Sequence, residues 1–135
     1  MRNGLRVADL VLARAAVNTD FYCDSVLSGL VPVRVVAETA RVLAFEHTAP
    51  TWETHIVVIP KAHIPRLIDV KDSSLFSEIM QLIVTIIKTR GWAESNYKII
   101  TNGGSYQSTP HLHFHLVSGA PLDPANPAQR GEISV

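Results

Sequence analysis

Three histidines alternate with apolar residues near the C-terminal end of the sequence, and this alternation restricts the fold more than any other feature. The stretch is Thr109-Pro110-His111-Leu112-His113-Phe114-His115-Leu116-Val117. Successive side chains of a β-strand point to opposite faces, so the imidazoles share one face and the apolar side chains between them share the other. In a helix, residues two apart would point in different directions. The pattern therefore predicts a strand from His111 to Val117 with an apolar underside packed on a core.

Three chemical interpretations of this histidine face are open. The imidazoles could be ordinary surface or core residues, which is the usual case for one histidine alone. They could hold a metal ion, since neutral imidazole is a common zinc ligand. They could also carry out covalent catalysis, in which one imidazole attacks phosphorus while its neighbours hold oxygens and move protons. Because an unperturbed imidazole titrates at about pH 6.5, both protonation states are accessible near neutral pH.

The geometry of a strand limits the metal interpretation. Alternate Cα atoms are about 6.7 Å apart and the outer pair about 13 Å apart, so a flat strand offers two ligands to one ion but hardly three. The preceding loop favours catalysis on a phosphate, because Asn102 to Pro110 is rich in turn formers and hydrogen-bonding side chains. Glycine-containing loops bring backbone N–H groups close to phosphates. Gln107 and Ser108 would then lie at the rim of the histidine face.

These residues resemble the histidine triad nucleotide-binding family, whose signature is His-x-His-x-His followed by apolar residues. The match runs from Gln107 to Val117, with Asn102 at a suitable distance before it. A second block, Thr54 to Ile64, is similar to the family's other characteristic segment. The resemblance covers residues 20 to 119. It implies an α+β fold, in which an antiparallel sheet of about five strands packs against one long helix.

The resemblance also implies catalytic roles. His113 would attack the phosphorus atom, and His115 and His55 would bind phosphoryl oxygens and share the proton transfers. His111 would hold the strand in place, and Ser108 would assist the leaving group. The implied contacts to the nucleotide or its phosphate come from Asn102, Gln107, His47, Phe45, Val26 and Tyr22. The implied reaction needs no metal and no other cofactor.

Two positions depart from the family pattern. An acidic residue typically binds the ribose hydroxyls, and an equal-length alignment puts His47 there, which loses bidentate acceptance from a diol. Many relatives carry a Cys-x-x-Cys pair that contributes to a structural zinc site, whereas this chain has Asp20 and Cys23. One thiol and one carboxylate close a tetrahedral site less well than two thiolates, so no bound zinc is expected. His63 is expected to be an ordinary solvated residue.

The function expected from this resemblance is hydrolysis of a phosphoramidate or a similar α-phosphate linkage. A nucleotidyl-histidine intermediate would release a nucleoside monophosphate, with AMP as the first expectation. His115 favours hydrolysis, because the nucleotidyltransferase branch usually has glutamine there. The Gln107-Ser108 pair resembles the phosphoramidase branch more than the dinucleoside polyphosphate hydrolases. Two alternatives stay open, namely a dinucleoside polyphosphate hydrolase of the Ap4A type and a nucleotide-binding regulatory protein with incidental activity.

The remaining segments predict the elements around this site. Two β-rich runs at 33–37 and 40–45 suggest a hairpin, and 55–59 suggests a central strand. Residues 97–101 suggest a strand that leads to the site loop. A broad apolar stripe after the N-cap cluster Asp72-Ser73-Ser74 predicts one long helix ending near residue 90, and polar residues on its other faces exclude a bilayer span.

With 135 residues, the chain is expected to form one domain at 20–119. Residues 1–19 would be an extension with a helix near 6–17, and 120–135 an irregular proline-rich tail. The net charge is 0 and no basic tract stands out, so we expect neither nucleic acid nor membrane as a partner. The single cysteine makes a cytoplasmic setting the default. The resemblance implies a homodimer that acts on a purine nucleotide.

Overall fold

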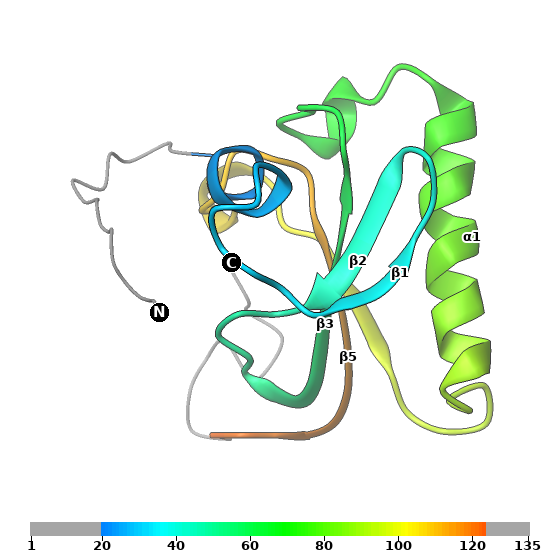
Figure 1. Ribbon diagram of the computed structural model, residues 1–135. Helices are drawn as coiled ribbons and strands as arrows, with labels where there is room; N and C mark the ends of the chain where they lie inside the picture. Colours follow the sequence, from blue (N-terminus) through cyan, green and yellow to red (C-terminus); the bar gives the residue numbers. More distant parts are fainter. Residues whose placement is uncertain (1–19, 124–135) are drawn as a thin grey trace.

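The computed structural model describes residues 20–123, so the helix predicted near 6–17 and most of the predicted tail lie outside the described residues. The described part contains one antiparallel sheet with the strand order β1-β2-β3-β5-β4. One long helix, α1, packs along one side of this sheet (Figure 1). The α+β architecture with five strands and one main helix is confirmed.

The first three strands form a meander. β1 (Val35–Glu38) and β2 (Val42–Glu46) make the predicted hairpin, closed by a hydrogen bond from the Thr39 N–H to the Val42 carbonyl oxygen. β3 (Trp52–Pro60) begins three residues earlier than the predicted strand. The earlier start follows from pairing, because Trp52 lies opposite Pro121 of β5.

Helix α1 (Ser73–Thr89) has the predicted start and end. The Asp72 carboxylate accepts a hydrogen bond from the Ser74 N–H, which satisfies one of the free amides of the first turn. Three short helices complete the described chain: η1 (Tyr22–Leu27), η2 (Leu67–Asp69) and η3 (Gly104–Tyr106). Within residues 20–123, none of the helices has the length and apolar composition that a bilayer crossing requires.

The histidine-bearing segment differs from the prediction in where its strand begins. β5 (Phe114–Pro121) starts three residues after His111 and continues two residues into the predicted tail, between β3 and β4 (Lys98–Ile100). Before β5, the Leu112 N–H donates to the carbonyl oxygen of Ile64, a loop residue, instead of a strand neighbour. Side chains nevertheless still alternate there, because Leu112 packs in the main core whereas the rings of His111 and His113 contact Tyr22.

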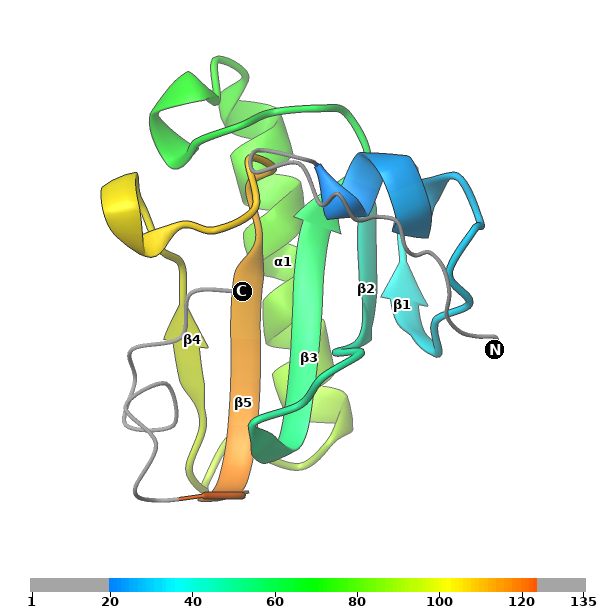
Figure 2. The ribbon, with the colours of Figure 1, turned by 90° about the vertical axis from the view of Figure 1, so that its left-hand side faces the viewer.

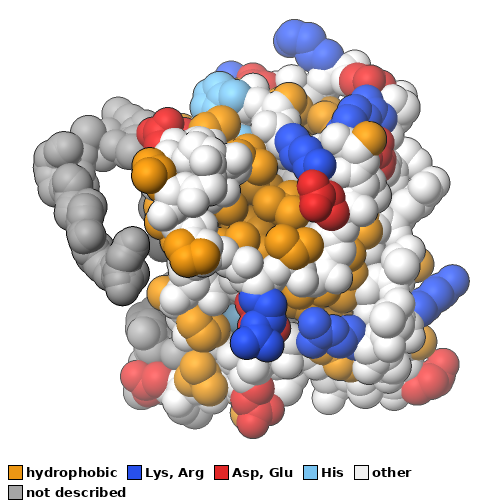
Figure 3. All heavy atoms as spheres, viewed as in Figure 1, with side chains coloured by type: hydrophobic (Ala, Val, Ile, Leu, Met, Phe, Trp, Pro, Cys, Tyr) orange, Lys and Arg blue, Asp and Glu red, His pale blue; other side chains and the backbone are white. Residues whose placement is uncertain are grey.

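The two faces of the sheet have different partners. Leu112, Phe114 and Leu116 belong to the main core, together with the buried residues of α1. The three imidazoles point to the opposite face, where η1 lies across the sheet (Figure 2). Histidine side chains reach the surface only in small areas of the face drawn in Figure 3, whereas apolar atoms fill its middle. The predicted separation of an apolar underside from a histidine face is confirmed.

Candidate active site

The histidine face is buried by the surrounding chain. His113 and His115 are 2% and 0% exposed, and His55 from the neighbouring strand β3 is 4% exposed. The ring centroids of His113 and His115 lie 5.1 Å apart in a T-shaped arrangement, and those of His55 and His115 lie 5.0 Å apart. The structure therefore brings together the three imidazoles to which the sequence assigns the phosphorus chemistry.

Backbone contacts fix the proton on His113. Its Nδ1 lies 2.7 Å from the carbonyl oxygen of His111, so Nδ1 carries the proton and donates it to that oxygen. Burial is the main cause that lowers the pKa of His113, and the neutral ring then has its lone pair on Nε2. Nε2 is buried and has no hydrogen-bond partner among the described residues. A neutral imidazole in this tautomer presents a nucleophilic nitrogen to the site.

A second chain of hydrogen bonds fixes the protons on His55 and His115. The Thr51 N–H donates to His55 Nδ1 at 3.1 Å, so the proton of His55 is on Nε2. This Nε2–H donates to His115 Nδ1 at 2.8 Å, and His115 therefore carries its own proton on Nε2. His115 thus presents an N–H donor, and its Nε2 is buried without a partner within residues 20–123.

Burial keeps these two imidazoles neutral. Burial lowers the pKa of His55 to about 3, and the nearby ring of His47 contributes to the shift. Burial also lowers the pKa of His115 to about 2, with further contributions from His113, His55 and His47. Near neutral pH, both rings consequently act as hydrogen-bond donors and acceptors without a charge.

This burial predicts how stability changes with pH. In the unfolded chain the two imidazoles bind protons at their ordinary pKa of 6.5, but in the folded protein they do so only at about pH 3 and 2. The unfolded state therefore binds more protons as pH falls below 6.5, and we expect the free energy of unfolding to decrease in that range. Urea unfolding at intervals from pH 7.5 to 5 measures the slope, which His55→Gln should reduce. A free energy of unfolding that stays constant across this pH range would contradict the conclusion that burial keeps His55 and His115 neutral.

The atoms that lack partners are concentrated at the predicted site. Buried side-chain nitrogens without a hydrogen bond, counted over the described residues, are Asn102 Nδ2, His113 Nε2, His115 Nε2 and Trp52 Nε1. Buried polar atoms are rarely left unpaired, and three of these four belong to residues implicated in phosphate binding. Together the three supply one lone pair and two N–H donors. This combination is complementary to a phosphoryl group, whose phosphorus accepts electrons and whose oxygens accept hydrogen bonds.

The loop between β4 and β5 places the other polar residues. The Thr101 hydroxyl donates to the carbonyl oxygen of His113 at 2.9 Å, which brings the adjacent residue Asn102 close to the segment that carries His113. The Gln107 amide nitrogen donates to the carbonyl oxygens of Pro65 and Thr109 at 2.6 Å and 2.9 Å. Both N–H bonds of Gln107 are thus used by backbone carbonyls, and among the described residues its own carbonyl oxygen remains available as an acceptor. Ser108 follows directly and is exposed.

An apolar cluster adjoins His113. Tyr22, Val26 and Phe45, the three apolar residues implicated in nucleotide binding, pack in one buried cluster. The Tyr22 ring lies 5.0 Å from that of His113 and 6.0 Å from that of Phe45. On the other side of the triad, the His47 ring packs against that of His55 at a centroid distance of 4.2 Å, with the two rings tilted by 31°. The Ala49 N–H donates to His47 Nδ1 at 2.8 Å, so His47 carries its proton on Nε2.

Sequence reasoning missed a polar cluster beneath η1. It contains Asp20 and Cys23 together with His63 and His111. His63 was expected to be an ordinary solvated residue; its side chain is 52% exposed, but its Nδ1 also lies 2.6 Å from a carboxylate oxygen of Asp20. The Asp20-x-x-Cys23 spacing was the available signal, but the distant histidines become neighbours only through the fold.

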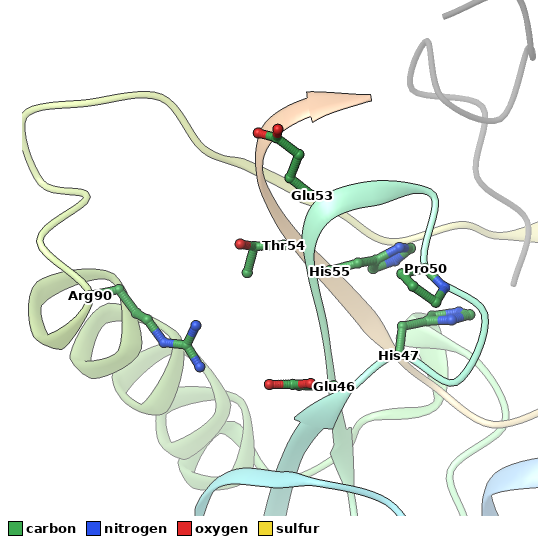
Figure 4. Close-up of a pocket in the computed structure, with 7 residues that line it drawn as sticks. All are labelled: Glu46, His47, Pro50, Glu53, Thr54, His55 and Arg90. Atoms are coloured by element: carbon green, nitrogen blue, oxygen red, sulfur yellow. The ribbon is translucent and has the colours of Figure 1, made fainter. Parts of the chain in front are cut away.

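A small cavity of about 140 Å³ also lies next to the imidazoles (Figure 4). His47 and His55 form one side of it. Glu46 and Arg90 point toward each other across the opposite side. The sequence did not indicate that Arg90, at the end of α1, would line this cavity.

Fold and site together define a protein with a cluster of buried imidazoles on the face of a five-stranded sheet opposite its long helix. A family model described as the HIT domain matches residues 29–122. The chain belongs to the HIT domain family.

Similar proteins agree with this assignment. The chain is 35% identical over 94 residues to adenosine 5'-monophosphoramidase hnt1 of Schizosaccharomyces pombe, covering 68% of each chain. It is 32% identical over 98 residues to purine nucleoside phosphoramidase of Escherichia coli, covering 70% of this chain and 82% of the relative. Among solved structures, a histidine triad protein from Clostridium difficile is 36% identical with a TM-score of 0.67, covering 76% of this chain and 92% of that one.

Proposed function

We propose that this protein releases a nucleoside monophosphate, AMP by first choice, from a phosphoramidate through a nucleotidyl-His113 intermediate. The observation that carries the proposal is the unpartnered, buried Nε2 of His113, whose lone pair is set by the hydrogen bond from Nδ1–H to the His111 carbonyl. The chain is a hydrolase of the HIT family, and two relatives are named adenosine 5'-monophosphoramidase and purine nucleoside phosphoramidase.

The first chemical step would form a bond between His113 Nε2 and the α-phosphorus. The phosphorus–nitrogen bond of the substrate breaks, and the amine leaves with a proton delivered through the Ser108 hydroxyl. The neutral Nε2–H of His115 and the Asn102 amide would donate to the phosphoryl oxygens. Because the pKa of His115 is about 2, this ring would stabilise negative charge by hydrogen bonding without becoming charged itself.

The second step would return His113 to its starting state. Water forms a new phosphorus–oxygen bond, the bond between phosphorus and Nε2 breaks, and a proton of the water replaces the one given to the amine. Gln107 would orient this water, because its carbonyl oxygen is the part of the amide that the loop leaves available. The reaction products are then the monophosphate and the free amine.

The nucleoside would occupy the apolar cluster of Tyr22, Val26 and Phe45 beside the nucleophile. His47 would face the ribose as a donor, because its Nδ1 already accepts from the Ala49 N–H. His47 therefore offers one N–H donor to one ribose oxygen, where an acidic side chain would accept hydrogen bonds from two ribose hydroxyls. This difference supports a looser preference for the ribose than an acidic side chain would give.

A homodimer in a cytoplasmic setting completes the proposal. β4 is the edge strand on its side of the sheet. Tyr97, which precedes β4, is 42% exposed, and Ile99, which lies in β4, is 44% exposed. An edge strand with exposed apolar side chains is suited to pairing with a second copy. The cytoplasmic setting rests on the single cysteine, Cys23, which is free.

Comparing two substrates tests the proposal. Adenosine phosphoramidate and diadenosine tetraphosphate are incubated separately with the enzyme, and AMP release is followed by chromatography. We expect kcat/KM for the phosphoramidate to be higher by at least about tenfold, equivalent to about 1.4 kcal/mol in the transition state. A preference for the tetraphosphate would replace the proposal with a dinucleoside polyphosphate hydrolase. Binding of AMP without turnover of either substrate would replace it with a nucleotide-binding regulatory protein.

A further inference from the structure

The strand order leaves one side of the histidine face for the leaving group. The apolar cluster proposed for the nucleoside comes from η1 and β2, whereas His115 lies on β5. β4 lies on the other side of β5 from η1 and β2 (Figure 2). The nucleoside and the leaving amine are attached to different positions of the α-phosphorus. An amine that leaves while the nucleoside lies toward β2 therefore extends toward β4.

Two side chains of β4 face the same way as the imidazoles. Ile100 pairs with His115, and Lys98 pairs with Val117. Residues that pair directly share a face of the sheet, and across β5 Val117 also pairs with His55. Diagonal neighbours on antiparallel strands lie about 7 to 8 Å apart, so Lys98 is one diagonal step from His115. The ammonium of Lys98 is thus within reach of a group attached to the α-phosphorus.

An apolar cluster of Trp52, Val117 and Ile100 lies next to the imidazoles, separate from the main core. Trp52 begins β3 and is 7% exposed. Its indole Nε1 is one of the four buried nitrogens without a hydrogen-bond partner among the described residues. A buried indole N–H usually has an acceptor, and the other three nitrogens belong to residues implicated in phosphate binding. We therefore infer that the indole N–H also donates to the substrate.

Lys98 adds a positive charge to this cluster. Its Nζ lies 5.0 Å from the centroid of the Trp52 ring. Such a cation–π contact holds the ammonium against the sheet. Within residues 20–123 no carboxylate forms an ion pair with Lys98, whereas Lys61, for comparison, pairs with Glu38. An ammonium and an indole N–H over an apolar floor together favour a carboxylate as the ligand.

The cavity of about 140 Å³ beside the imidazoles has a different charge. Glu46 and Glu53 line it together with Arg90. Glu46 is also 3.7 Å from Arg34. Two carboxylates facing one guanidinium give this cavity a net negative charge, which would repel a carboxylate of the substrate. An anionic leaving group is therefore better placed beside β4 than in this cavity.

We propose that Lys98 and the Trp52 indole bind a carboxylate carried by the leaving amine, which makes the β4 side a subsite for the leaving group. The proposal rests on the proposed phosphoramidate hydrolysis and specifies its substrate class. A carboxylate separated from the nitrogen by several methylene groups reaches farther than one on the adjacent carbon. It therefore matches the diagonal step between His115 and Lys98, and the methylene groups would lie against Ile100 and Val117.

A pair of matched substrates tests this subsite. The adenosine phosphoramidates of 4-aminobutyrate and of its uncharged amide, 4-aminobutyramide, are assayed side by side, and the glycine derivative tests the length of the chain. We expect kcat/KM for the 4-aminobutyrate compound to exceed that of the amide by at least about fivefold, mainly through KM. This ratio should fall as salt is added, because an ion pair with an exposed lysine is screened.

Variants of Lys98 show whether its charge causes the preference. Lys98→Met should bring the ratio of the acid to the amide close to one, and Lys98→Glu should make the amide the better substrate. Trp52→Phe, which keeps an aromatic ring but removes the N–H, should lower the ratio by a smaller factor. Lys88→Met is the matched control, because Lys88 is an exposed lysine on α1, and it should retain the full ratio.

Equal kcat/KM values for the acid and the amide in the unmodified enzyme would overturn the subsite. So would Lys98 variants that slow both compounds equally, because a purely structural lysine would act in that way. A glycine derivative that is better than the 4-aminobutyrate derivative would overturn the placement of the carboxylate beside Lys98. Unsubstituted adenosine phosphoramidate separates the two proposals, because its hydrolysis depends on the imidazoles and its failure to release AMP would contradict the proposed function itself.

Discussion

Replacing His113 with alanine should lower AMP release from adenosine phosphoramidate by at least about 10³-fold, because the reaction loses the nucleophile that we propose for it. AMP should still bind, since the apolar cluster around Tyr22 and Phe45 and the donors of Asn102 and His115 stay in place. Single-turnover kinetics measures the chemical step, and titration calorimetry measures AMP binding. The expected result is a loss in kcat with a change of only a few-fold in the dissociation constant.

His113→Asn is the matched control for this experiment. The asparagine amide nitrogen can occupy the place of Nδ1 and keep the hydrogen bond to the His111 carbonyl, but it provides no counterpart of Nε2. It should be as inactive as the alanine variant and more stable. Substantial AMP release by either variant would show that another group attacks phosphorus. Equal inactivity with retained AMP binding would leave Nε2 as the atom responsible.

Truncating Leu116 to alanine should lower the free energy of unfolding by about 3 kcal/mol. Leu116 is 0% exposed and packs in the core on the helix side of β5, so the change leaves a cavity that the surrounding side chains fill only partly. Its neighbour His115 faces the opposite side of the same strand. We therefore expect the folded fraction of Leu116→Ala to keep the kcat of the unmodified protein. Urea unfolding gives the stability, and activity assays well below the transition give the rate.

Leu30→Ala provides the comparison, because Leu30 is 72% exposed and its truncation should change the free energy of unfolding by less than about 0.5 kcal/mol. Similar losses for the two variants would mean that burial does not determine the effect. A marked fall in the kcat of folded Leu116→Ala would mean that the underside of β5 controls the position of the imidazoles more closely than the separation of the two faces suggests.

Local pattern was sufficient for most of the fold. The apolar stripe after Asp72 defined α1 because a helix repeats its buried face within a few residues. The alternation around His113 defined which side chains share a face. The limits of β3 and β5 were less accessible, because Trp52 and Pro121 extend each other through a pairing between distant segments. The ends of a strand depend on the residues that pair with it, and the local sequence does not show which distant segment provides that pairing.

The site likewise divides into residues that the local sequence pattern predicts and features that depend on contacts made only in the fold. The histidine pattern and its loop identified His113, His115 and Asn102, each of which has a buried nitrogen without a hydrogen-bond partner within residues 20–123. Their proton positions could not be predicted, because these depend on backbone groups such as the Thr51 N–H and the His111 carbonyl. The contact of His63 with Asp20 was missed for a related reason. The two residues are 43 positions apart, and no residue near His63 in the sequence indicates that their side chains meet.

The placement of β5 has a consequence for protein synthesis. This strand is the last of the described chain, yet it lies between β3 and β4, which are made before it. In a nascent chain that has not yet released β5 from the ribosome, β3 and β4 lack the partner that β5 provides, and His115 is not yet in place beside His55. The entry of β5 between β3 and β4 thus both completes the sheet and brings the imidazoles together. Incomplete translation products would be open to aggregation and unable to consume nucleotides.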